Sequence, residues 1–438
     1  MTIACKWISA ALLSITLLAG SGAAAAWSAT PQDQAKPNYT LAEYNAYQAA
    51  HNEKDPQAKI KALDDFVGKY PMSELLQFAY NDYYLTYLAL KKYPEAITNV
   101  DKLLALGDKI NATARLTALV ARAQAFSAGS ADKTLQTPEQ YTKTRDAATQ
   151  GLAILGKYEK PANMTDEQFA GTKKNIGMLF NNVAGMADSG LKDYKAAVDS
   201  YKAALALDPN DPLTHYRMGI ADLQLMPADA VGGYWELSRA LALKVPGDAQ
   251  VRAYLRNQLL HYQQPGCDKL VDDEINQMVT LATSSPDRPE TLTIPSADDL
   301  KKAQEDTANF IPWLQEGGDH GKTMWLATCG LEYPDVAVRV MEVTPDGDNL
   351  TLKVFRAATE EEMQAATAPN MEVHVVGQPD AKRIQKDDYV RFTGTLTAYA
   401  QSPFLLTWEN AKVNTEDISP EKAAPGAKRP AHALPPKK

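Results

Sequence analysis

The residues from Gly317 to Thr323 come nearest to a chemical signature in this chain. Their sequence, Gly-Gly-Asp-His-Gly-Lys-Thr, ends like a phosphate-binding loop. Such a loop needs a glycine five residues before its Gly-Lys-Thr, where this chain has Glu316. It also follows a strand, whereas a helical pattern runs through Trp313 and Leu314. We therefore interpret the segment as a linker and not as a nucleotide site.

Other residue types that support catalysis lack the spacing that catalysis requires. None of the histidines has a His or Cys partner at metal-ligand spacing, and no Gly-x-Ser-x-Gly nucleophile motif occurs. The carboxylate groups at Asp272-Asp273 and Glu360 to Glu362 could supply an acid and a base, but adjacent carboxylates on helices are usually solvated. We expect no catalytic residues, no metal and no cofactor, and therefore a protein that is not an enzyme.

Composition narrows the class of partner. The chain has 438 residues, of which 45% are apolar and 23% charged, as in folded globular proteins. Its net charge of -9 argues against a surface that neutralises nucleic-acid phosphates or anionic lipid. We expect a protein or peptide partner and no nucleic acid, and the sequence leaves the oligomeric state open.

The first 26 residues have the pattern of a signal peptide. Lys6 precedes an apolar run from Trp7 to Ala19, and small residues then end at Ala26. The alternative, an uncut membrane anchor, is opposed by the Ser, Thr and Gly residues between Trp7 and Ala26. We predict an exported protein, periplasmic or secreted, with no integral membrane segment after cleavage.

Low-complexity segments are predicted at both ends of the mature chain. Residues 27–38 are expected to form a flexible leader, and residues 416–438 a disordered basic tail rich in Pro, Ala and Lys. The tail could serve solubility alone or contact an acidic polymer of the envelope.

Two cysteines remain once Cys5 is removed with the signal peptide. They are Cys267 and Cys329, and in an oxidising compartment they could pair as a disulfide. Two separate buried thiols would fit the sequence equally well. A zinc site is not expected, because these cysteines have no nearby histidine pair.

Residues 39–262 show helical spacing of their apolar positions, interrupted at Pro and Gly. The clearest unit, residues 178–211, alternates small and large side chains along two helices. Its defining residues are Gly185, Tyr194, Ala197, Tyr201, Ala204 and Pro209. Small residues let two helices approach closely, and Tyr201 fills the space to the next pair.

This unit resembles the tetratricopeptide repeat (TPR), a 34-residue helix-turn-helix. Similar but less complete units occupy residues 77–110 and 212–246, the second with Gly219 at the matching place and an apparent insertion at Gly232-Gly233. Weaker pairs span about 40–71 and 111–157. Because one repeat cannot bury its own apolar face, the resemblance implies an α-helical solenoid over residues 39–262.

Beyond the solenoid, residues 263–330 are expected to form a helical connector that either continues the stack or braces the next domain. Residues 331–415 change to a period of two, with five strands separated by turns. This small β domain resembles an OB-type five-stranded barrel, in which Gly394 could bend the long fourth strand. Twelve acidic residues against eight basic ones between 333 and 415 disfavour a nucleic-acid groove, so Phe392 and Trp408 are interpreted as core. The predicted class is mainly α: a TPR-type solenoid followed by a small C-terminal barrel.

A TPR stack binds along the groove lined by its first helices, which the resemblance places at particular residues. The candidates are Tyr44, Asn45, Asn81, Asp82, Asn182, Met186, Tyr216 and Arg217. Amides can bond a peptide backbone and aromatic rings supply contact area, although the same residues could simply pack or meet solvent.

The function expected from the sequence is an interaction scaffold of the cell envelope that holds a protein or peptide in the solenoid groove. The alternative is a carbohydrate- or peptidoglycan-associated binder that acts through the barrel, and the third possibility is a divergent enzyme.

Overall fold

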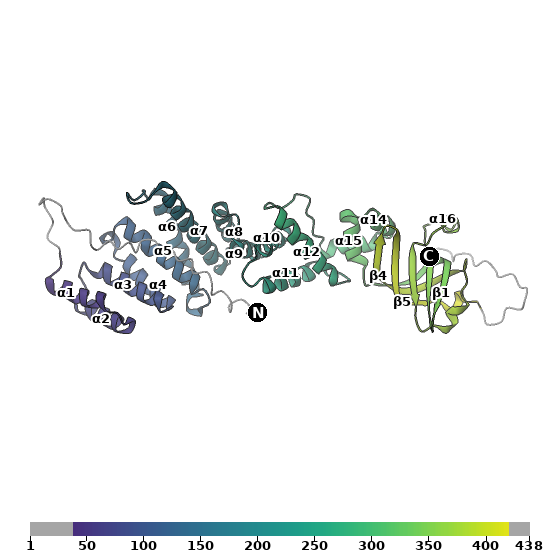
Figure 1. The fold of residues 1–438 in the computed structure, drawn as a ribbon, viewed down its shortest axis with the longest axis horizontal. Helices are drawn as coiled ribbons and strands as arrows, with labels where there is room; N and C mark the ends of the chain where they lie inside the picture. Colours follow the sequence, from purple (N-terminus) through teal and green to yellow (C-terminus); the bar gives the residue numbers. More distant parts are fainter. Residues whose placement is uncertain (1–37, 420–438) are drawn as a thin grey trace, which may run out of the picture. The chain divides into compact units, whose positions relative to one another are not determined.

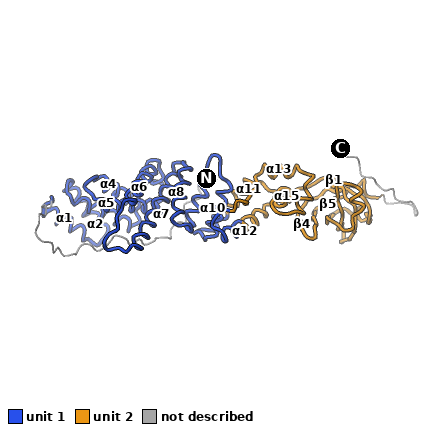
Figure 2. Tube along the Cα trace, turned by 90° about the horizontal axis from the view of Figure 1, so that it is seen from above, with its two compact units in different colours: residues 1–252, 278–288 blue, residues 253–277, 289–438 orange. Residues whose placement is uncertain are grey.

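The computed structural model describes residues 38–419, which divide between two compact units (Figure 2). Unit 1 comprises Met1–Arg252 and Met278–Arg288, and unit 2 comprises Ala253–Gln277 and Pro289–Lys438. The predicted signal peptide, most of the leader and most of the tail lie outside the described residues. No helix of the described range is long and apolar enough to cross a membrane.

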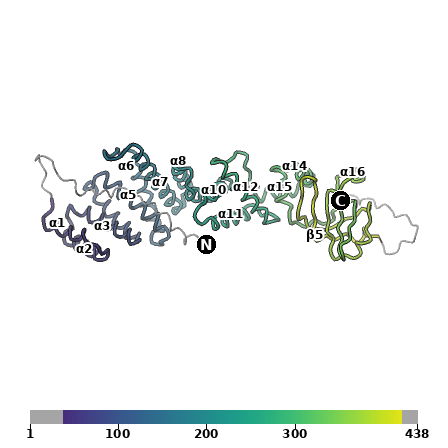
Figure 3. Tube along the Cα trace, in the orientation of Figure 1, coloured from purple at the N-terminus to yellow at the C-terminus, as the bar shows by residue number. Residues whose placement is uncertain are grey.

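Unit 1 is a stack of helix pairs that follow one another in chain order (Figures 1 and 3). The predicted α-solenoid is therefore confirmed, including the two weaker pairs at about 40–71 and 111–157. The pairs are α1 (Leu41–Asn52) with α2 (Pro56–Lys69), α3 (Leu76–Ala89) with α4 (Tyr93–Leu104), α5 (Ala112–Ala128) with α6 (Pro138–Lys157), α7 (Asp166–Gly190) with α8 (Tyr194–Leu207), and α9 (Pro212–Leu223) with α10 (Ala230–Ala242).

Local signals in the sequence set where these helices begin. The side chain of Asp193 accepts a hydrogen bond from the backbone N–H of Ala196, which starts α8 at Tyr194. Lys192 turns the chain just before this cap with a φ of 64°, a left-handed conformation that ends α7. At α9, Asp211 is the cap and Pro212 the first helical residue, where a missing backbone N–H costs nothing.

The small and large positions of the best unit pack as the sequence predicts. Tyr201 is 2% exposed, and a Cβ added to Gly185 would lie 2.5 Å from the Cε1 atom of its ring. Ala197 and Ala204 are buried on the same helix, α8. Glycine at 185 thus allows α7 to approach α8 closely enough to enclose the tyrosine ring.

A similar close approach joins α9 to α10 at two glycines. A Cβ on Gly219 would lie 2.8 Å from the carbonyl oxygen of Gly233, and a Cβ on Gly233 would lie 2.9 Å from that of Gly219. Gly232 and Gly233 are therefore helical residues at the crossing and are not the insertion that the sequence suggested. The extra residues form the loop between Leu223 and Ala230, whose length the repeat pattern does not specify.

Unit 2 begins with helices that precede its barrel. They are α11 (Asp248–Gln263), α12 (Lys269–Ser284), α13 (Ala297–Glu305), α14 (Phe310–Glu316) and α15 (Gly318–Thr328). The residues of α11 and of α12 are divided between the two units. A disulfide joins Cys267, just before α12, to Cys329, just after α15.

The phosphate-loop-like segment is helical and not the linker that we predicted. Gly317 and Gly318 have φ angles of 74° and 58°, which turn the chain sharply out of α14, and α15 then runs through Lys322. The prediction failed because the two glycines resemble loop residues, whereas here Gly317 separates two short helices and Gly318 begins the second.

After α15, unit 2 forms the closed five-stranded barrel that the sequence predicts. Its strands are β1 (Glu332–Asp346), β2 (Asn349–Phe355), β3 (Met371–Val375), β4 (Tyr389–Gln401) and β5 (Phe404–Val413), and the short helix α16 (Glu360–Ala365) lies between β2 and β3. The strand order is β1-β2-β3-β5-β4, with β3 parallel to β5 and the other pairs antiparallel. This closure leaves the barrel no free sheet edge.

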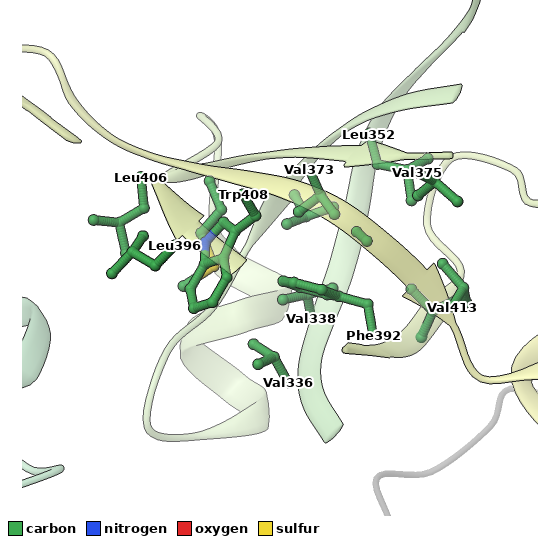
Figure 4. Packing of buried hydrophobic residues seen from close by; sticks show 14 of the residues in the cluster. Val336, Val338, Leu352, Val373, Val375, Phe392, Leu396, Leu406, Trp408 and Val413 are labelled. Atoms are coloured by element: carbon green, nitrogen blue, oxygen red, sulfur yellow. The ribbon is translucent and has the colours of Figure 1, made fainter. Parts of the chain in front are cut away.

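The inward-facing residues of all five strands fill the barrel (Figure 4). Phe392 and Trp408 are 1% and 2% exposed and meet edge to face, so they belong to the core. The register between β4 and β5 shifts between Thr393 and Thr395, which places an irregularity at Gly394. The long fourth strand can bend there because glycine brings no side chain into the crowded interior.

Candidate functional site

The first helices of successive pairs form one continuous layer of unit 1. Helix α1 packs against α3, α3 against α5, α5 against α7, and α7 against α9. In a helical repeat stack such a layer lines the binding groove. We call its exposed side the first-helix surface, defined by Tyr44, Asn45, Phe78, Asn81, Leu85, Asn182, Met186, Tyr216 and Arg217.

On α1 and α3 this surface combines apolar side chains with amides. Tyr44, Phe78 and Leu85 are 40%, 48% and 48% exposed, which is unusual for large apolar residues. Asn45 is exposed beside Tyr44, and Asn81 is half-buried between Phe78 and Leu85. Within residues 38–419 the Asn81 amide makes no hydrogen bond, so its donors and acceptor are available to a ligand.

Asp82 does not belong to the exposed side. It is 5% exposed, accepts a hydrogen bond of 3.0 Å from the hydroxyl of Tyr47, and lies 2.8 Å from Nδ1 of His51. Burial, reinforced by the Asp82 carboxylate, raises the pKa of Tyr47 far above its ordinary value. Asp82 thus links α3 to α1. It was predicted as a groove residue, but its side chain holds two helices together and does not face the groove.

Helix α7 presents Asn182 and Met186 at half-buried positions. The Oδ1 atom of Asn182 accepts a hydrogen bond of 2.6 Å from the hydroxyl of Thr214 on α9, which links two neighbouring first helices. Met186 packs against the buried cluster shared by α3 to α7. Both residues therefore help to shape the surface, and the amide nitrogen of Asn182 is the part left for a ligand.

Helix α9 contributes Arg217, a cation whose charge interacts with Asp211 and Tyr201 at a distance. Tyr216 and Arg217 are half-buried, and burial raises the pKa of Tyr216 and lowers that of Arg217. In the described part of the chain, Arg217 forms neither a hydrogen bond nor an ion pair. A partly desolvated guanidinium without such a partner favours an incoming carboxylate or carbonyl oxygen.

Phe78 and Leu85 are surface residues that the sequence-based prediction missed. They lie three residues before and four residues after Asn81, so all three share one face of α3. That spacing was visible in the sequence. Their exposure was not, because apolar residues at such spacing usually mark the buried side of a helix.

A second polar cluster lies where α9 turns into α10. Asp222 is 3% exposed, and its Oδ2 atom has no hydrogen-bond partner within the described residues. Burial, together with the charges of Glu236 and Asp229, raises the pKa of Asp222 to about 7, against the opposing influence of Lys202 and Arg288. This carboxyl group titrates near neutral pH.

The remaining sequence candidates for chemistry are dispersed. Lys322 lies 2.6 Å from the buried carboxylate of Glu274, which neutralises its charge. His374 bridges Glu372 and Glu409 on strands β3 and β5. Across residues 38–419, no three His, Cys, Asp or Glu side chains gather as a metal site requires.

Comparison with known proteins identifies the repeat. Residues 191–225 match the family described as TPR repeat, and this span covers α8, the following turn and α9. A solved structure, the C-terminal part of a TPR repeat-containing protein from Cytophaga hutchinsonii, is 17% identical and matches 56% of this chain and 96% of its own length, with a TM-score of 0.26. No curated protein matches the chain. The chain thus carries a TPR repeat within its α-solenoid, a type of unit that serves protein-protein interaction.

Proposed function

We propose that this protein is a non-enzymatic scaffold of the cell envelope and that it binds a protein or peptide partner on the first-helix surface. Two observations carry the proposal: exposed apolar side chains on α3 and, further along the same layer of first helices, a guanidinium on α9 without a hydrogen bond or ion pair among the described residues. Phe78 and Leu85 remain about half exposed, and Arg217 makes no hydrogen bond or ion pair among the described residues. Aromatic anchors and arginine often dominate binding energy, and here these are Phe78 and Arg217.

The chemistry of the surface indicates what the partner segment carries. An apolar side chain of the partner would cover Phe78 and Leu85, and the Asn81 amide would bond its backbone. An acidic side chain or a backbone carbonyl of the partner would accept hydrogen bonds from the Arg217 guanidinium. We therefore propose a partner segment with an apolar anchor and an acidic group.

Two features support the location in the envelope. Residues 1–26 have the pattern of a signal peptide, and the disulfide between Cys267 and Cys329 is typical of oxidising compartments. Fractionation of cells tests this part of the proposal, which requires the protein in the envelope or the medium with its disulfide formed.

Site-specific photo-crosslinking in intact cells tests the binding surface. A photoreactive residue in place of Leu85 should capture a partner, and Phe78→Ala or Arg217→Ala in the same chain should reduce capture about tenfold or more. Asn182 is a poorer choice, because its bond to Thr214 holds α7 to α9.

The control position is Met226, which is 98% exposed in the loop before α10 and lies off the first helices. A photoreactive residue at position 226 should capture less of the partner than one at position 85. As a second control, Lys195→Ala on α8 should leave capture at position 85 unchanged. Equal capture at both positions, or capture at 85 that survives Phe78→Ala and Arg217→Ala, would contradict the proposal.

A further inference from the structure

Unit 2 contains a cavity of about 490 Å³ between α12, α15 and the end of β4. Its volume lies within the range of small-molecule and side-chain binding sites. The lining includes Gly318, Asp319 and Lys322 from the segment that resembles a phosphate loop. The disulfide from Cys267 to Cys329 holds the start of α12 to the end of α15 and so fixes two walls of the cavity.

The cation in this cavity is already neutralised. The side chain of Lys322 lies 2.6 Å from Oε1 of Glu274, whose other carboxylate oxygen accepts a hydrogen bond of 2.7 Å from Gln263. Glu274 is 2% exposed, and its Oε1 atom accepts no hydrogen bond of regular geometry. The cavity thus already contains one ammonium group, that of Lys322, paired with a buried carboxylate.

Two further carboxylates line the cavity without partners. Asp273 and Asp319 are exposed, and within residues 38–419 neither makes a hydrogen bond or an ion pair. Three carboxylates against one ammonium leave the lining with a net negative charge. An anion such as phosphate would be repelled, whereas a cation would be attracted.

Aromatic rings complete the lining. Trp325 and Tyr399 are half-buried with their ring centroids 4.9 Å apart, and Leu270 and Leu326 add apolar surface. The faces of tryptophan and tyrosine attract ammonium and guanidinium groups, and the apolar surface suits the alkyl stem that carries such a group.

We infer that this cavity binds an organic cation, an alkylammonium or guanidinium group on an apolar stem, as in a lysine or arginine side chain. The cation is held between Asp273 and Asp319 and against Trp325 and Tyr399. This inference goes beyond the first-helix surface, lies wholly in unit 2, and does not depend on the function proposed for unit 1.

Calorimetric titration of the full chain tests the inference. The probes are Nα-acetyl-lysine methylamide and Nα-acetyl-arginine methylamide, with the norleucine analogue as an uncharged probe of similar stem. We expect both cationic probes to bind, the norleucine probe to bind at least about tenfold more weakly, and affinity to fall as ionic strength rises.

Variants assign binding to the cavity. Asp273→Asn and Asp319→Asn should each weaken the lysine probe about threefold, and the double variant about tenfold, because each exposed ion pair contributes little alone. Asp298→Asn on α13 is the matched control, an exposed aspartate outside the lining, and should leave affinity unchanged. Circular dichroism of each variant checks that the fold is retained.

The source of the cation is a separate arm of the experiment. Residues 420–438 of this chain contain Lys422, Lys428, Arg429, Lys437 and Lys438. If the chain's own tail supplies the cation, replacing these five residues by glutamine strengthens binding of the lysine probe. If a separate molecule supplies it, the replacement leaves the affinity unchanged.

Three results would overturn the inference. They are equal binding of the norleucine and lysine probes, undiminished lysine binding in the Asp273→Asn/Asp319→Asn variant, and binding of inorganic phosphate or of N-acetylglucosamine oligomers in place of the cationic probes.

Discussion

The contact between Gly185 and Tyr201 allows the repeat packing to be tested by adding a single methyl group. A Cβ at position 185 would lie 2.5 to 2.7 Å from three atoms of the Tyr201 ring, and that ring is 2% exposed. Nothing lies within 4 Å of the Cβ that an alanine would add at Gly171, on the same helix α7. The two positions therefore differ in steric environment while sharing one helix.

The magnitude follows from two contributions. Replacing a helical glycine by alanine favours the helix by about 1 kcal/mol, and this gain applies at both positions. At 185 the methyl group must also displace a buried ring, and overpacking of this kind costs about 1–3 kcal/mol. We expect Gly171→Ala to stabilise the protein, and Gly185→Ala to be about 1–3 kcal/mol less stable than Gly171→Ala.

Urea unfolding followed by far-ultraviolet circular dichroism measures this difference in the transition of unit 1. A third variant, Tyr201→Leu, removes the ring, and in that background Gly185→Ala should no longer be penalised. If Gly185→Ala proves as stable as Gly171→Ala in the otherwise unchanged chain, the proposed close packing of α7 on α8 is refuted.

Two further predictions concern the disulfide and the buried carboxyl group. Replacing both cysteines, Cys267→Ser/Cys329→Ser, should lower the free energy of unfolding of unit 2 by about 4 kcal/mol in the chain-entropy model, because the cysteines are 62 residues apart. A denaturant midpoint equal to that of the oxidised protein would contradict this prediction. The pKa of Asp222 is raised from 3.8 to about 7, so the folded protein binds the proton more tightly and loses stability as pH rises between these values. The free energy of unfolding of Asp222→Asn should therefore rise by about 2–4 kcal/mol relative to that of the unsubstituted protein as pH increases across that interval. Unfolding at a series of pH values measures this difference. A difference that stays constant with pH would contradict the raised pKa of Asp222.

The repeat could be predicted because its determinants are local in sequence. The small and large residues that pack α7 on α8 lie within one 34-residue unit, as do the cap at Asp193 and the proline that follows α8. The barrel was predictable for a similar reason, because alternation along each strand reveals which side is buried. In both cases a residue's neighbours along the chain determine its environment.

The site was less predictable because its environment depends on distant residues. Asp82 has the helix position of a groove residue, but it is buried by Tyr47 and His51, which lie 35 and 31 positions away. The pairing of Cys267 with Cys329 depends in the same way on how α12 and α15 pack, so the sequence left it open. The exposure of Phe78 and Leu85 depends on where the neighbouring helices leave space.

The segment from Gly317 to Thr323 shows why a motif must be judged by the charges that the fold brings to it. In the sequence alone, its Gly-Lys-Thr ending suggests affinity for phosphate. Two features of the sequence argue against a phosphate loop: the missing glycine at position 316 and the helical pattern before the segment. In the folded unit, Glu274 comes from a different helix and neutralises Lys322, while Asp273 and Asp319 contribute further negative charge. Three carboxylates against one ammonium make the lining net negative, so the charges around Lys322 favour a cation although the lysine alone would attract an anion.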